Sequence, residues 1–146
     1  MSKNKAEHIE LSIVMPCLDE AETVGKCVEK AREFIEKYDI SGEVIVADNG
    51  SRDNSAEIAR SAGATVINIR EKGYGSALKG GIDTARGKYI IIGDSDSSYD
   101  FSNLMPFLEN LREGYDIVMG NRFKGGIRSG VMEWDKKYIG KLLMSC

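Results

Sequence analysis

Short apolar runs alternate with helical patterns along this chain of 146 residues, and this alternation restricts the possible folds more than any other feature. The apolar runs are rich in β-branched residues, as buried strands are, and they occupy residues 11–15, 44–47, 65–69, 89–92 and 117–119. In the segments between them, apolar side chains recur at helical spacing. Strands that alternate with helices form a parallel sheet covered by those helices. We therefore expect an α/β fold with a mostly parallel sheet flanked by helices.

Capping residues and glycines predict where the helices begin and end. The first helix is expected over residues 20–37, because Asp19 with Glu22 three positions later forms a capping-box-like start. A second helix should follow Asp53 and end at Gly63.

Two further helices are expected in the second half of the chain. The third should end at Gly87, since glycine favours helix ends. The fourth contains Pro106, which a helix tolerates in its first turn. Trp134, Tyr138 and Leu142 fall four residues apart and indicate an amphipathic helix near the end of the chain.

Charge and cysteine content exclude several functional classes. The net charge of −3 provides no general attraction to a polyanion, so we expect no nucleic-acid partner. No apolar run approaches the ~20 residues needed to cross a bilayer, and the start MSKNKAEHIE lacks the apolar stretch of a secretory signal. Cys17, Cys27 and Cys146 are odd in number and lack metal-ligand spacing. We expect a reducing, cytoplasmic location.

Polar residues collect directly after the predicted strands. In open parallel sheets, ligands bind beyond the carboxyl ends of the strands, so these residues should share one edge. The segments concerned are residues 16–20, 48–53, 70–75 and 94–96.

Each of these segments also has a purely structural interpretation. Asp19 is explained as a helix cap, and residues 48–53 as an ordinary turn. Gly73 and Gly75 superficially resemble a dinucleotide loop, but that loop follows the first strand and has a third glycine where this chain has Leu78.

Asp94 and Asp96 are the hardest residues to explain structurally. Carboxylates that end a buried strand are costly unless they are solvated, hydrogen-bonded or bound to a cation. Mg²⁺ takes oxygen ligands, usually one or two carboxylates together with substrate phosphates and water. A divalent cation and a nucleoside diphosphate would together account for the pair.

The four segments together resemble the family-2 glycosyltransferases of the GT-A fold. Within that family the resemblance is to the subgroup related to dolichol-phosphate mannosyltransferase and bacterial polyprenyl-phosphate sugar transferases. It covers nearly the whole chain, in the stretches SIVMPCLDEAETV, VIVADNGSRDNS, EKGYGSALKGGIDTARGKYIIIGDSDSSYDF and IVMGNRFKGG. Two positions depart from the family: many relatives have Asn where Asp19 stands, and the most similar family pattern, Asp-Ala-Asp-Asp, has a further acid where this chain has Ser97.

The resemblance implies a role for each matched residue. Asp94 and Ser95 of the D-x-D motif would bind the ribose and the metal diphosphate, and Asp96 would be the ligand of Mg²⁺ or Mn²⁺. Pro16, Leu18 and Glu20 match the loop that holds the nucleoside.

The remaining matches concern the base and the phosphates. Asp48 matches the acid that hydrogen-bonds the nucleobase, and Lys72 and Gly73 fall in a loop near the donor. Arg122 of GNRF matches a basic residue near the phosphates and joins Asp94 and Asp96 in the expected catalytic set.

The implied reaction is a metal-assisted, inverting transfer of a hexose from a UDP- or GDP-linked sugar. The resemblance implies a polyprenyl phosphate as acceptor, and hence a reaction at the cytoplasmic face of a membrane. Arg122, Lys124 and Arg128 would then hold an acceptor phosphate or the departing diphosphate, and the alternative for these residues is a solvated basic loop. A sugar-hydroxyl acceptor would instead need a general base, for which Glu133 or Asp135 is the candidate.

Relatives continue beyond the GNRF motif, so the chain divides into two expected parts. Residues 1–124 form a nucleotide-sugar-binding GT-A domain, and residues 125–146 form the start of a truncated or shortened acceptor region. Trp134, Tyr138 and Leu142 are expected to contact a second copy of the chain.

Two alternatives to a glycosyltransferase stay open. One is a non-catalytic, self-associating half that binds a nucleotide. The other is a nucleotidyltransferase, although that class carries a Gly- and basic-rich phosphate loop where this chain has PCLDEAETV.

Overall fold

The computed structural model describes residues 8–97, 100–113, 117–120 and 142–145. These residues form a parallel sheet of six strands in the order β3-β2-β1-β4-β5-β6. The strands are β1 (Leu11–Cys17), β2 (Gly42–Asp48), β3 (Thr65–Asn68), β4 (Tyr89–Ile92), β5 (Ile117–Gly120) and β6 (Leu142–Ser145). The expected α/β class is confirmed, and β1 to β5 match the predicted runs to within two residues at each end.

Strand β6 was not predicted. It pairs with β5 in parallel, with Leu142 opposite Ile117. The helix expected through Leu142 is therefore wrong at that residue, whereas Trp134 and Tyr138 lie outside the described residues. The division of the chain after residue 124 stays a prediction.

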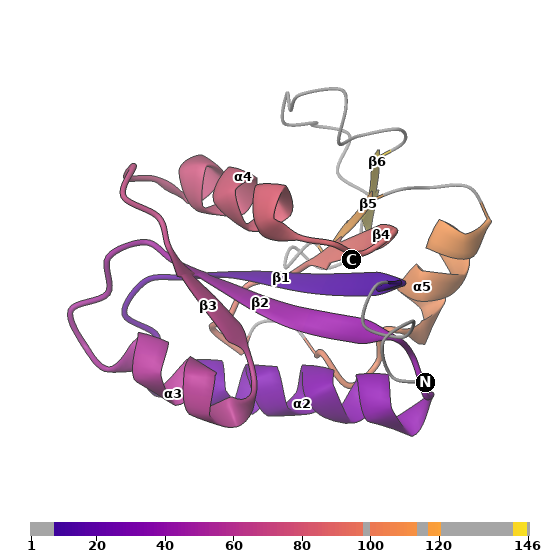
Figure 1. Cartoon of the computed structure of the whole chain (residues 1–146), viewed down its shortest axis with the longest axis horizontal. Helices are drawn as coiled ribbons and strands as arrows, with labels where there is room; N and C mark the ends of the chain where they lie inside the picture. Colours follow the sequence, from indigo (N-terminus) through magenta and orange to yellow (C-terminus); the bar gives the residue numbers. More distant parts are fainter. Residues whose placement is uncertain (1–7, 98–99, 114–116, 121–141, 146) are drawn as a thin grey trace.

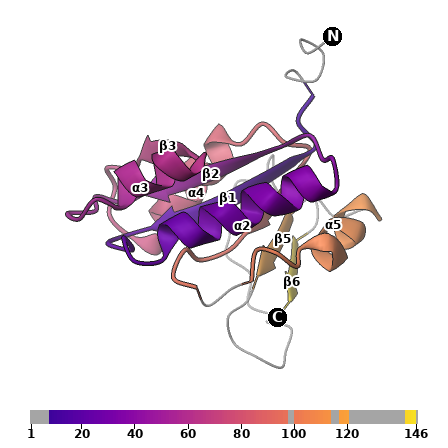
Figure 2. The same cartoon turned by 90° about the horizontal axis from the view of Figure 1, so that it is seen from below.

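Helices cover both faces of the sheet, as Figures 1 and 2 show. Helices α2 (Val24–Lys37) and α3 (Ser55–Ala62) lie on one face, and α4 (Tyr74–Thr84) lies on the other. Helix α5 (Met105–Arg112) shares its buried side chains with the core beneath α2. Pro106 falls in the first turn of α5, as predicted.

Strand β1 contributes to both cores because its side chains alternate between the faces. Ile13 and Met15 pack toward α2, and Val14 packs with Leu78 of α4. Each buried side chain of this size contributes about 1.5–3 kcal/mol. The central strand is therefore fixed from both sides, which also fixes the loop that follows it.

The first helix begins four residues later than expected, because its predicted start is a loop. Backbone N–H groups of residues 19–21 donate to side chains of residues 51–55, and we call this contact the loop clasp. Its pairs are Asp19 to Ser51 Oγ at 2.8 Å, Glu20 to Ser55 Oγ at 2.8 Å, and Ala21 to Asp53 Oδ2 at 3.1 Å.

The carboxylate of Asp19 completes the clasp instead of capping a helix. It accepts hydrogen bonds from the N–H groups of Arg52 at 2.7 Å and Asp53 at 3.4 Å. Asp19 itself has a φ of +54°, a left-handed conformation that no helix start adopts. The capping-box prediction was therefore wrong, because tertiary hydrogen bonds replaced the local ones.

Gly63 and Gly87 were predicted to end the next two helices. Gly63 ends α3 in the left-handed conformation with φ +114°, as predicted. Helix α4 ends at Thr84 rather than at Gly87. Gly87 is instead pressed against β1, where a Cβ atom would lie 2.6 Å from the backbone nitrogen of Ser12.

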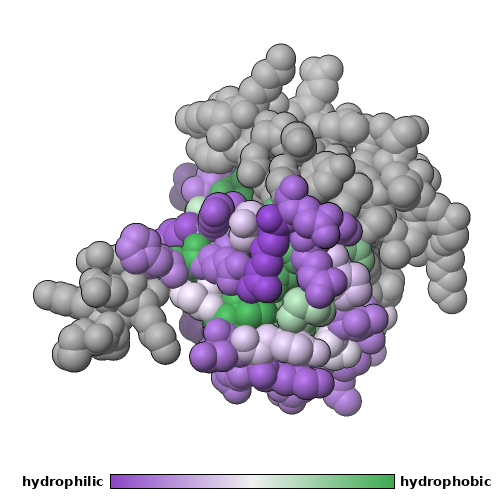
Figure 3. All heavy atoms as spheres, turned by 90° about the vertical axis from the view of Figure 1, so that its right-hand side faces the viewer, coloured by the Kyte–Doolittle hydropathy of each residue, from purple (hydrophilic) through white to green (hydrophobic). Residues whose placement is uncertain are grey.

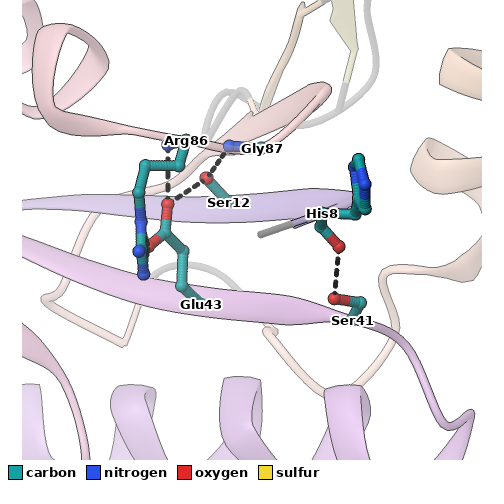
Figure 4. Close-up of polar contacts among 6 residues, drawn as sticks. All are labelled: His8, Ser12, Ser41, Glu43, Arg86 and Gly87. Atoms are coloured by element: carbon teal, nitrogen blue, oxygen red, sulfur yellow. Dashed lines mark hydrogen bonds and ion pairs between the residues drawn. The ribbon is translucent and has the colours of Figure 1, made fainter. Parts of the chain in front are cut away.

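A buried polar contact joins the amino ends of the central strands, as Figure 4 shows. The Glu43 carboxylate accepts hydrogen bonds from Ser12 Oγ at 2.6 Å and from Arg86 through N at 2.8 Å, Nε at 3.2 Å and Nη2 at 3.1 Å. Gly87 N donates to Ser12 Oγ at 2.8 Å. These bonds attach the connection between α4 and β4 to β1 and β2.

The segments that follow β1, β2 and β3 lie together at the left of Figure 1. At the opposite end, mostly hydrophilic residues cover the described surface around a smaller hydrophobic area (Figure 3).

Among the described residues, no helix has the length and apolar character to span a membrane.

Candidate functional site

A pocket lies where the strand order reverses. Strands β2 and β3 extend from one side of β1, and β4, β5 and β6 extend from the other, so ligands are expected between the ends of β1 and β4. A cavity of about 370 Å³ opens there. We call it the switch-point pocket; its lining residues are Pro16, Cys17, Leu18, Glu20, Asn49, Lys72, Gly73, Tyr74, Ala77, Asp94, Ser95 and Asp96.

The structure brings most of the predicted site residues into this pocket. Eight of them line it: Pro16, Leu18, Glu20, Lys72, Gly73, Asp94, Ser95 and Asp96. Asp48 is not among the lining residues, and Arg122 lies outside the described residues. Lys124, Arg128, Glu133 and Asp135 also lie outside them.

Ser95 attaches the segment of Asp94 and Asp96 to the neighbouring strand and helix. Its side chain is buried, and Ser95 Oγ donates to the carbonyl of Pro16 at 2.8 Å. Thr23 Oγ1 donates to the carbonyl of Ser95 at 2.6 Å. Ser95 is thus held by β1 and by the start of α2, while Asp94 and Asp96 on either side of it remain partly exposed at the pocket.

Tyr74 contacts one of the two acids directly. The Tyr74 hydroxyl donates to Asp94 Oδ1 at 2.6 Å across the pocket wall. Tyr74 is 52% exposed and lines the pocket, so its ring is accessible to a ligand there. Sequence reasoning did not select Tyr74, although its place next to Gly73 in a strand-end loop was a usable signal.

The pocket has a strongly negative wall. Burial raises the pKa of Glu20, and the negative charges of Asp96, Asp94, Asp53 and Asp19 raise it further. A bound cation would offset the repulsion between these carboxylates. Among the described residues lining the pocket, Lys72 is the single positively charged one.

The acids do not enclose a metal by themselves. No group of three His, Cys, Asp or Glu side chains within the described part of the chain could hold an ion. A donor set of one or two carboxylates fits a hard cation that takes its other oxygens from phosphates and water. Asp94 and Asp96 meet that description.

Asp48 organises the turn after β2 rather than facing the pocket. It is buried, and its carboxylate accepts from Ser51 N at 3.0 Å, Ser51 Oγ at 2.5 Å and Gly50 N at 3.3 Å. Its neighbour Asn49 is the residue of this turn that lines the pocket. Sequence reasoning noted Asn49 only as part of the segment 48–53.

Two apolar or neutral residues complete the lining. Cys17 ends β1 and is buried, and this burial raises the pKa of its thiol, so the side chain is neutral. Ala77 comes from the first turns of α4. Neither was selected from the sequence, because each reads as an ordinary core position.

Comparisons with known proteins agree with this arrangement. A sequence profile described as glycosyl transferase family 2 matches residues 12–145. The low-salt glycan biosynthesis hexosyltransferase Agl6 of Haloferax volcanii is 40% identical over 136 residues, which cover 92% of this chain and 33% of that protein. The dolichyl-phosphate hexose transferase of the same organism is 32% identical over 117 residues, covering 80% of this chain and 50% of that protein.

A solved structure shows a similar fold. It is glucosyl-3-phosphoglycerate synthase from Mycobacterium tuberculosis in complex with Mn²⁺, uridine diphosphate and glucosyl-3-phosphoglycerate. The two share 25% identity and a TM-score of 0.54, over 63% of this chain and 35% of that one. The expected GT-A fold is confirmed. The chain spans between a third and half of the length of these proteins.

Proposed function

Since this chain belongs to glycosyl transferase family 2, we propose that it contributes to inverting transfer of a hexosyl group from a nucleoside-diphosphate sugar to a polyprenyl phosphate. The observation that carries the proposal is the switch-point pocket, where two carboxylates of a D-x-D motif and a lysine line one cavity of about 370 Å³. Two relatives named as a hexosyltransferase and a dolichyl-phosphate hexose transferase support the hexose and the lipid phosphate. In this proposal residues 1–124 bind the donor, and residues 125–146 begin the acceptor region.

The lining residues divide between the parts of the donor. Pro16, Leu18 and Glu20 would hold the nucleoside, with half-exposed Leu18 offering apolar surface to the flat base. Asp94 and Ser95 would lie at the ribose. Lys72 and Gly73 would lie at the diphosphate, where a lysine supplies positive charge and a glycine lets the backbone approach closely.

A divalent cation fits the acidic wall of this pocket. Asp96 would hold Mg²⁺ or Mn²⁺ with help from Asp94, and the donor phosphates would supply further oxygens. When bound, the cation would neutralise charge on the diphosphate as it leaves. Before any cation binds, Ser95 keeps both carboxylates on the pocket wall through its bond to Pro16.

A phosphate acceptor simplifies what the protein must do. Its oxygens are ionised near pH 7, because a phosphate has its second pKa at about 6, so the chain needs no general base to form the nucleophile. The chain must instead bring the acceptor oxygen to the anomeric carbon on the side opposite the diphosphate. Arg122, with Lys124 and Arg128, is proposed to hold phosphate groups during this step.

The test measures binding and transfer on the same protein. Calorimetric titration with UDP, GDP and their hexose derivatives in Mn²⁺ should reveal micromolar or tighter binding of one nucleotide class, about −8 kcal/mol or better. Incubation of a labelled donor with polyprenyl phosphate should then yield lipid-linked hexose of inverted anomeric configuration, read by NMR. Binding without any sugar release would indicate a nucleotide-binding module, and pyrophosphate release from a nucleoside triphosphate would indicate a nucleotidyltransferase.

Asp48→Ala should lower nucleobase discrimination through the turn that places Asn49 at the pocket. We expect the preference between pyrimidine and purine diphosphates to fall by about tenfold, and stability to fall by about 1–3 kcal/mol as Gly50 and Ser51 lose their acceptor. Titrations with UDP and GDP, together with thermal melting, check both values.

Asp100→Ala is the matched control for Asp48→Ala. Asp100 accepts hydrogen bonds from the backbone and side chain of Ser102 in a similar local turn, and it does not line the pocket. Its replacement should leave base preference unchanged. A variant at Asp48 that melts earlier but keeps the original base preference would assign Asp48 to stability alone.

A further inference from the structure

Asn49 ties the turn after β2 to the loop after β3. Asn49 Nδ2 donates to the carbonyls of Ile69 at 3.1 Å and Glu71 at 2.8 Å, and Asn49 Oδ1 accepts from Gly73 N at 2.9 Å. Both amide hydrogens and the amide oxygen are therefore engaged with one short segment. The residue is only 7% exposed, so water cannot readily replace these bonds.

An amide is the group that this environment requires. Two carbonyl oxygens face Nδ2 and one N–H faces Oδ1, so the pattern matches the donors and acceptor of asparagine. A carboxylate at the same place would point an oxygen at two carbonyl oxygens. Alanine would leave the carbonyls of Ile69 and Glu71 and the N–H of Gly73 without this partner.

The segment that Asn49 holds carries the pocket's lysine. Lys72 lies between Glu71 and Gly73, the last two partners of Asn49. Its ammonium group lies over the turn, since a Cβ atom placed on Gly50 would be 3.7 Å from Lys72 Nζ. Gly73 has φ +120°, a conformation that glycine adopts readily and other residues rarely do.

We propose that Asn49 is a positioning residue that holds residues 69–73 so that Lys72 faces the diphosphate of the donor. This inference rests on the proposed function for its ligand, but the Asn49 contacts themselves do not depend on it. Lys72 is the single positively charged residue among the described lining residues. Its placement therefore decides how well the pocket attracts an anionic diphosphate. Holding it in place before binding reduces the loss of entropy when the diphosphate arrives.

A double-mutant cycle tests whether Asn49 acts through Lys72. The proteins are wild type, Asn49→Ala, Lys72→Met and the double variant, titrated in Mn²⁺ with the nucleoside diphosphate that wild type prefers. Each single change should weaken binding by about tenfold. In the double variant the loss at position 49 should fall below about threefold, because the group that it positions is gone. Losses that simply multiply would overturn the proposal.

A second measurement needs no nucleotide. Amide hydrogen exchange of Gly73, followed by NMR on the free protein, should be at least about tenfold faster in Asn49→Ala than in wild type. Asn49→Ser should show the same direction and covers the case in which the alanine variant folds poorly. The control is Asn103→Ala, an exposed asparagine before α5, which should leave Gly73 exchange unchanged.

The two measurements separate the two proposals. A wild-type protein that binds no nucleoside diphosphate contradicts the proposed function, and faster Gly73 exchange in the variant would still support the placement of the loop by Asn49. Unchanged Gly73 exchange in Asn49→Ala and Asn49→Ser would overturn the positioning role even if wild type binds nucleotide tightly.

Discussion

Replacing Asp96 with alanine should remove the dependence of nucleoside-diphosphate binding on a divalent cation. Wild-type protein should bind at least about a hundredfold more tightly in Mn²⁺ than in EDTA, because cation, carboxylates and phosphates share charge in one site. The variant should bind weakly and equally in both conditions. We choose Asp96 because it matches the metal ligand of the D-x-D motif, whereas replacing Asp94 would remove the acceptor of the Tyr74 hydroxyl.

The measurement is a pair of calorimetric titrations for each protein, one with Mn²⁺ and one with EDTA. Asp83→Ala is the control, since it removes an exposed acid from α4 that pairs with Lys79 and does not line the pocket. The control should keep the full difference between Mn²⁺ and EDTA. Equal wild-type affinity in Mn²⁺ and EDTA would contradict the metal-dependent site altogether.

The sheet could be predicted because strand signals are local. Runs such as 44–47 and 89–92 are apolar over their whole length, as strands covered on both faces must be. Parallel order then places the segments after these runs on one edge, which predicted Glu20, Lys72 and Asp94 as neighbours in space. The pocket confirmed that grouping, since all three line it.

The residues that hold the site in place could not be predicted, because their partners are distant in sequence. Thr23 reaches the carbonyl of Ser95 across 72 positions, and Asn49 reaches Gly73 across 24. No spacing rule connects such pairs. Asp19 illustrates the same limit, since its local pattern indicated a helix cap and its actual partners are Arg52 and Asp53.

For Arg122 and the residues around it, the prediction depended on the family resemblance. The GNRF motif was matched by resemblance, and its arginine lies outside the described residues. The phosphate contact proposed for Arg122 therefore rests on family membership and on the place of the motif directly after β5 (Ile117–Gly120) in the sequence.

The second large effect is expected far from the pocket, at the amino end of β2. Glu43→Ala should destabilise the protein by about 2–3 kcal/mol, because Ser12 Oγ and the backbone N–H of Arg86 lose their acceptor in a buried place. Ser12 is fully buried, and the Glu43 side chain is 11% exposed. The ion pair itself contributes less, since the Arg86 side chain is 67% exposed and solvent screens its charge. Thermal melting should show a decrease of roughly 8 °C for a domain of this size.

Glu10, which also accepts two hydrogen bonds from one arginine side chain, provides the comparison for Glu43→Ala. Glu10 accepts from Arg112 Nε at 2.8 Å and Nη2 at 3.0 Å, but this pair lies on the surface, so Glu10→Ala should cost under about 1 kcal/mol. Glu43→Ala should also leave nucleotide affinity unchanged below its melting temperature, since Glu43 lies near the amino end of β2 and the pocket lies beyond the carboxyl end of that strand. A loss no greater than that of Glu10→Ala would mean that backbone pairing and apolar packing hold β1, β2 and the connection before β4 together without a contribution from Glu43. A loss of nucleotide affinity without a loss of stability would instead mean that Glu43 influences binding in the pocket from the opposite end of the sheet. None of the described contacts links the two places.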